Sequence, residues 1–125
     1  MTFLRLGLTA TMLLAATGAS MQTGHAAELV YDLSITDGKV AENMRSIRVK
    51  QGDVVKLRWS TDRPVIVHLH GYDIEKAVKP GVATDMTFTA RATGRFAVHL
   101  HQAAGAPAGQ AHEEAPLVSV EVYPR

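Results

Sequence analysis

Apolar and polar residues alternate with a period of two along much of the chain between residues 29 and 122. Val55, Leu57 and Trp59, for example, alternate with lysine and arginine. Side chains two residues apart on a strand point to the same side of a sheet, so this pattern is typical of strands with one buried face. No window of a dozen residues shows the period of an amphipathic helix. The sequence therefore predicts an all-β fold.

Turn-forming residues divide this pattern into seven or eight short strands. Gly38, Gly52 and Gly94 each follow a polar residue between two alternating segments. Residues 71–83, which include a Pro-Gly pair, are predicted to be irregular. Short strands at this spacing predict a single-domain antiparallel β-sandwich with Greek-key connections, and Trp59 is expected in its core.

Residues 1–26 have the features of a secretory signal peptide. A single arginine precedes a mainly apolar run, Leu6–Ala16, and small residues follow it. We predict cleavage after Ala26, with Ala27 as the near alternative. The apolar run is too short to span a bilayer, so no membrane span is expected after cleavage. Residues 27–125 would then form one periplasmic or secreted domain.

Composition excludes several kinds of site. The 125 residues include 13 lysines and arginines, 12 aspartates and glutamates, and no cysteine. Nucleic-acid binding is not expected, because a net charge of +1 gives no broad basic surface. A disulfide scaffold, a thiolate zinc site, a cysteine nucleophile and a blue-copper centre all need a thiol. The six histidines are the remaining candidates for site chemistry.

The sequence Val-His-Leu-His occurs twice and supplies two histidine pairs, His68 with His70 and His99 with His101. On a strand, the two histidines of a pair share one face and the apolar residues share the other. If the two strands are neighbours, the four imidazoles lie close enough to bind one ion. Imidazole ligands without a thiolate favour Cu(II), and they also suit zinc.

Two further residues are candidates for this site. His112 lies in the long connection 102–116, which is rich in alanine, glycine and proline, and it is predicted to be a fifth ligand. Asp73 follows the first histidine pair and could accept the second N–H of a bound imidazole. The alternative for all these histidines is an ordinary exposed position without a metal.

Two segments of the chain resemble the cupredoxin family. Ile47–Trp59, in which a Gly-Asp turn joins two strands, resembles the first hairpin of a cupredoxin, and Thr93–Val98 resembles the strand that leads to the copper cysteine. The resemblance implies a cupredoxin-like fold in which that strand lies beside the strand of the first histidine ligand. It implies His112 as the loop histidine and His68 or His70 as the histidine of the neighbouring strand.

The chain departs from this family at the copper site itself. His99 or Leu100 stands where the cysteine is expected, and no methionine follows His112, so type 1 electron transfer is not expected. His68–Gly71 resembles the His-x-His-Gly motif of multicopper oxidases, whose paired His-x-His motifs hold type 2 and type 3 copper. Oxidase activity is not expected to carry over, because those enzymes also need a type 1 site.

The leading hypothesis is an exported copper-binding protein for copper storage, delivery or tolerance. Its partners would be a copper ion and a periplasmic copper-handling protein. This hypothesis involves no enzymatic activity. An enzyme is one alternative, because Val67–Asp73 loosely resembles the copper segment of copper superoxide dismutases. A metal-free binding or structural sandwich is the other alternative.

Overall fold

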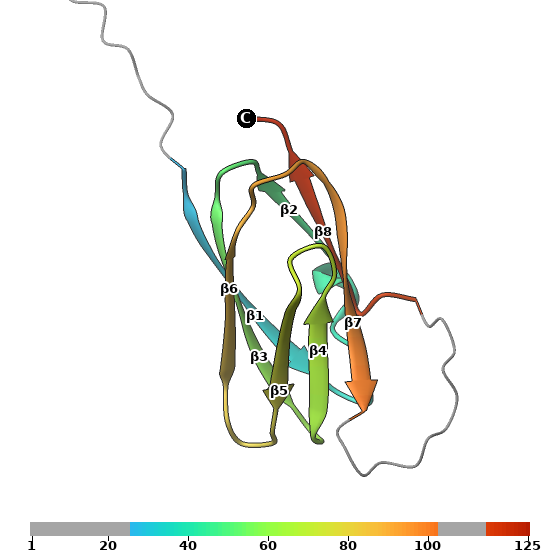
Figure 1. Cartoon of the computed structure of the whole chain (residues 1–125). Helices are drawn as coiled ribbons and strands as arrows, with labels where there is room; N and C mark the ends of the chain where they lie inside the picture. The colour runs from blue at the N-terminus through green and yellow to red at the C-terminus, as the bar shows by residue number, and fades with distance from the viewer. Residues whose placement is uncertain (1–25, 103–114) are drawn as a thin grey trace, which may run out of the picture.

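The computed structural model of the protein describes residues 26–102 and 115–125. This part of the chain contains eight strands and one short 3-10 helix, η1 (Glu42–Met44). Figure 1 shows how the strands are arranged. The strands are β1 (Glu28–Ile35), β2 (Ser46–Lys50), β3 (Val54–Thr61), β4 (Val65–Leu69), β5 (Ile74–Val78), β6 (Thr84–Thr89), β7 (Gly94–Gln102) and β8 (Val118–Tyr123). Within these ranges, no helix is long and apolar enough to cross a membrane.

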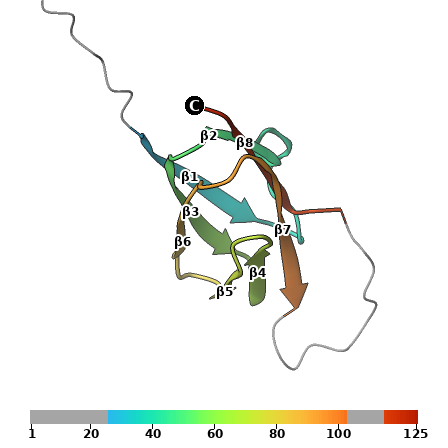
Figure 2. The ribbon, with the colours of Figure 1, turned by 45° about the horizontal axis from the view of Figure 1, so that its top comes forward.

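The strands form two sheets that enclose one core (Figure 1 and Figure 2). The smaller sheet has the order β1-β3-β6, and the larger has the order β2-β8-β7-β4-β5. The core includes Trp59 and Met86 from the smaller sheet and Val67 and Val120 from the larger. The predicted all-β sandwich and the buried position of Trp59 are therefore confirmed.

The two sheets are mixed. The pairs β3–β6, β4–β5, β4–β7 and β7–β8 are antiparallel, as predicted. In contrast, β1 runs parallel to β3, and β2 runs parallel to β8. Alternation of apolar residues indicates which face of a strand is buried, but it carries no information about the direction of the neighbouring strand.

The prediction that residues 71–83 are irregular is wrong for five of them. Residues 74–78 form the edge strand β5, which pairs antiparallel with β4. Glu75, Lys76 and Ala77 are exposed in succession, and only Val78 is buried. A strand without one regularly buried face has no period-two pattern, so it escapes a search for alternation. This strand matters for function because it borders β4.

Candidate metal centre

The two Val-His-Leu-His segments lie side by side, as a metal site shared by both histidine pairs requires. β4 pairs antiparallel with β7, and His68 stands directly opposite His99. Val67, Leu69 and Val98 are 0% exposed. Because these apolar side chains are in the core, the alternate side chains of both strands lie on the outer face. His68 on β4 and His99 and His101 on β7 therefore share one outer surface of the larger sheet. His70 directly follows β4, in the turn, and its ring contacts those of His68 and His99 on the same surface.

Three of these histidines bring their ring nitrogens close together. One nitrogen from each of His68, His70 and His101 lies within 4.8 Å of the other two. The ring centroids of His68 and His70 are 4.2 Å apart, and those of His68 and His101 are 5.7 Å apart. Two nitrogens bound to one ion at about 2.0–2.1 Å lie at most about 4 Å apart. His70 and His101 are exposed, so rotation of their side chains can close this gap.

The other two predicted ligands are placed differently. His99 packs edge to face against His70, with ring centroids 4.7 Å apart and ring planes at 89°. It lies outside the group of three converging nitrogens. His112 falls outside the described residues. The four histidines of the two Val-His-Leu-His segments thus separate into a group of three and one neighbour, and we call His68, His70 and His101 the histidine triad.

Gly71 sets the direction of the chain immediately after His70. Its φ is +86°, and a Cβ at this position would lie 2.7 Å from Cδ1 of Phe96. Phe96 in turn packs against Tyr72, with ring centroids 5.0 Å apart. The backbone N–H of His70 donates to the carbonyl of Ala97 at 2.9 Å, which continues the β4–β7 ladder. The glycine of the His-x-His-Gly segment therefore has a structural role of its own.

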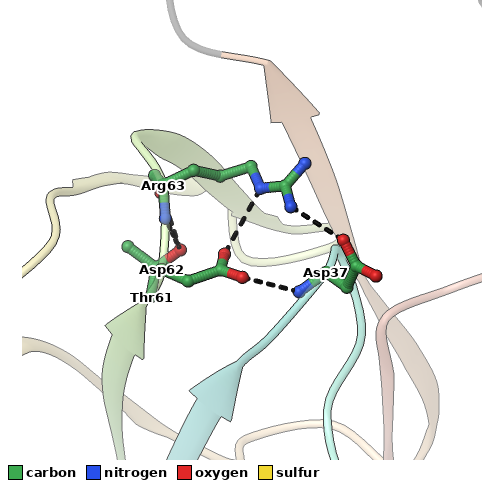
Figure 3. Close-up of polar contacts among 4 residues, drawn as sticks. All are labelled: Asp37, Thr61, Asp62 and Arg63. Carbon is green, nitrogen blue, oxygen red and sulfur yellow. Dashed lines mark hydrogen bonds and ion pairs between the residues drawn. The ribbon is translucent and has the colours of Figure 1, made fainter.

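A polar network ties the loop before β4 to the turn after β1 (Figure 3). The Arg63 guanidinium donates to Asp37 at 2.8 Å and to Asp62 at 3.3 Å. Asp62 also accepts a hydrogen bond from the backbone N–H of Asp37 at 2.9 Å, and the Thr61 hydroxyl donates to the Arg63 carbonyl at 2.7 Å. Exposed pairs such as these contribute little energy individually, but together they fix the loop that leads into β4.

The surroundings of His70 favour its neutral form. Desolvation lowers the pKa of His70 from its usual value, and the three neighbouring histidines lower it further. Asp73, which was predicted to interact with an imidazole, opposes this shift and raises the pKa. A neutral imidazole is the form that binds metal ions. The triad thus contains at least one ring whose surroundings help to keep it free of a proton.

Glu75 is a neighbour of the triad that the sequence analysis missed. It stands opposite His68 in the β4–β5 pairing, and its Oε1 lies 3.8 Å from Nδ1 of His68. Metal-bound histidines usually direct their second ring nitrogen toward a carboxylate or a carbonyl. The 3.8 Å separation is longer than a hydrogen bond, so rotation of the exposed Glu75 side chain would bring its carboxylate to Nδ1 for that role, with Nε2 of His68 facing the ion. No sequence signal pointed to Glu75, because β5 was not recognised as a strand.

The sequence matches no known family profile and no curated protein, whereas several solved structures match the fold. The periplasmic domain of subunit II of the cytochrome oxidase of Bradyrhizobium japonicum has a TM-score of 0.60 at 14% identity, over 77% of this chain and 84% of that chain. A heme-copper terminal oxidase has a TM-score of 0.55 at 20% identity, over 82% of this chain and 68% of that chain. The multi-copper oxidase of Pseudomonas thermotolerans gives 0.56 at 22%, over 81% and 31%.

These matched structures are cupredoxin-fold proteins, so the chain has a cupredoxin-like fold. At such low identity, the likeness establishes the fold alone. The chain spans less than half the length of the multicopper oxidase chains that it matches. It also has no cysteine, so the thiolate ligand of a type 1 copper site is missing. The domain is thus a cupredoxin-like sandwich with a histidine-rich outer face.

Proposed function

We propose that this domain binds copper, as Cu(II), through His68, His70 and His101 on the outer face of β4 and β7. The observation that carries the proposal is the convergence of their three ring nitrogens to within 4.8 Å of one another. An all-imidazole set suits Cu(II) and zinc, and the usual order of affinities favours copper. The likeness of the fold to domains of copper oxidases supports the same choice.

The exposed position of the triad supports a role in copper storage, delivery or tolerance. His70 and His101 are exposed, so a bound ion stays within reach of a second protein that offers ligands in exchange. We propose a periplasmic copper-handling protein as that partner. The domain would act outside the cytoplasm, after residues 1–26 have been removed as a signal peptide.

Copper retention tests this proposal directly. The full chain is produced in a host that exports it, given one equivalent of Cu(II) and desalted, after which its copper content and electron paramagnetic resonance spectrum are recorded. We expect about one copper ion per chain, with nitrogen hyperfine structure from the imidazole ligands. Retention of no copper would contradict the proposal and favour a metal-free binding or structural domain.

Matched substitutions locate the site. Replacing His68, His70 and His101 together by glutamine is expected to abolish copper retention. His99→Gln makes the same chemical change on the same pair of strands but outside the triad, so this variant is expected to retain copper. Added copper should raise the melting temperature of the wild-type protein and leave that of the triple variant unchanged, because a ligand stabilises only the state that it binds.

A further inference from the structure

Asp53 is the one charged side chain that is buried in the described part of the chain, with 4% of its surface exposed. Its Oδ2 accepts a hydrogen bond from the backbone N–H of Lys50 at 3.0 Å. Its Oδ1 accepts one from the backbone nitrogen of Ala27 at 3.1 Å and is paired with the guanidinium of Arg125. Desolvation raises the pKa of this carboxyl, but the hydrogen bonds and the nearby positive charges outweigh it and hold the pKa below its usual value.

Ala27 is attached to the fold at both its nitrogen and its oxygen. Its carbonyl accepts a hydrogen bond from the backbone N–H of Val54 at 2.9 Å, and its nitrogen donates to Asp53. Val54 is the first residue of β3, the strand that pairs with β1, and Asp53 directly precedes it. Cleavage after Ala27 would remove both contacts. Cleavage after Ala26 would keep both and turn the Ala27 peptide nitrogen into an ammonium group.

We propose that Asp53 is a binding site for the amino terminus that is created when the chain is cut between Ala26 and Ala27. In the uncut chain an uncharged peptide N–H of Ala27 donates to Oδ1 of Asp53. After cleavage the donor would be the α-ammonium group of Ala27, which carries a full positive charge. Hydrogen bonds between two charged groups are stronger than neutral ones. An ionised carboxylate has about four acceptor positions, so the ammonium joins Arg125 and Lys50 at this site without displacing either.

The surroundings of the cleavage point fit this role. Ala26 and Ala27 are exposed, so the bond between them is accessible to a protease, and the new ammonium keeps part of its contact with water. Asp53 is buried and ionised, and its hydrogen bonds hold its negative charge in a fixed position before cleavage. Removal of the leader would therefore strengthen the attachment of β1 to the turn that precedes β3.

The test compares two exported chains. In the first, the natural full chain is processed by the host, and mass measurement of the product is expected to show Ala27 as its first residue. In the second, one glycine is inserted between Ala26 and Ala27, which moves the ammonium group away but keeps the Ala27 peptide N–H. The natural product is expected to melt at least about 4 °C higher. Equal melting temperatures, or a mature chain that begins elsewhere, would overturn the proposal.

A charge-removing control separates the ion pair from other effects of the extra glycine. In the Asp53→Asn background, the difference between the two chains is expected to disappear, because an amide carries no charge. If that variant does not fold, selective acetylation of the Ala27 amine in the natural product replaces the ammonium group with an uncharged amide N–H and is expected to lower the melting temperature to the same extent. No change after acetylation would contradict the proposal. These measurements involve no copper, so their outcome does not depend on whether the histidine triad binds a metal ion.

Discussion

Replacing Gly71 by alanine tests how the turn after His70 is held in place. A φ of +86° strains a residue with a Cβ by about 1–2 kcal/mol. The added Cβ would lie 2.7 Å from Cδ1 and 3.0 Å from Cε1 of Phe96. Moving that ring away from Tyr72, against which it packs, costs about 1–3 kcal/mol more, the usual range for overpacking. We therefore expect Gly71→Ala to lower the free energy of unfolding by about 2–5 kcal/mol.

Gly81 provides the matched control for this experiment. Its φ is +79°, and a Cβ there would meet nothing within 4 Å, so Gly81→Ala should show the backbone strain alone, about 1–2 kcal/mol. Urea denaturation of both variants measures the difference. Phe96→Leu, combined with Gly71→Ala, should cost less than the sum of the two single changes, because the smaller side chain relieves the clash. Equal losses for the two glycine variants would refute the packing argument.

Three other perturbations address the triad and Asp53. Glu75→Gln is expected to weaken copper binding about tenfold in a chelator competition. This is the lower end of the usual loss of metal affinity when a carboxylate that orients a histidine ligand is removed. An unchanged affinity would mean that Glu75 does not orient His68. His101→Gln should weaken binding more than His99→Gln, because only His101 belongs to the triad, and the opposite order would contradict that assignment. The pKa of Asp53 is lowered in the folded protein. An unfolded aspartate titrates at about pH 3.9, so above that pH Asp53 stabilises the fold in full. This stabilisation is lost as the pH falls through the lower pKa of the folded state. Melting temperatures from pH 5 to pH 2 should therefore decline less steeply in Asp53→Asn.

The sequence was sufficient to predict β4 and β7 and the outward-facing positions of their histidines. Val67 and Leu69 flank His68 on β4, and burial of these apolar residues determines which way His68 points. His70 was predicted to lie on the same strand, but it falls in the turn that follows. The adjacency of β4 and β7 came from the resemblance to cupredoxins, because local patterns do not identify pairing partners. The register that places His68 opposite His99 is known only from the structure, because the direction of two strands does not fix their register.

The sequence was not sufficient for features that depend on side-chain rotamers or on distant segments. The selection of His101 over His99 for the triad depends on how the rings rotate above the sheet, and strand periodicity treats the two residues alike. Glu75 was missed because β5 is an edge strand with three consecutive exposed residues. The contact between Ala27 and Asp53 joins residues 26 positions apart. The cleavage signal and the Gly-Asp turn each drew attention to one of these residues, but neither motif predicts that the two are in contact.

The pairing of β4 with β7 means that the histidine triad exists only in the folded chain. His101 lies on β7, whereas His68 lies on β4 and His70 directly follows it, so separation of the two strands leaves behind only a local pair. An ion held by all three rings therefore opposes the separation of β4 from β7, and any change that loosens the core beneath these strands also releases the ion. The copper content of a purified sample would then report the fraction of its molecules that are folded.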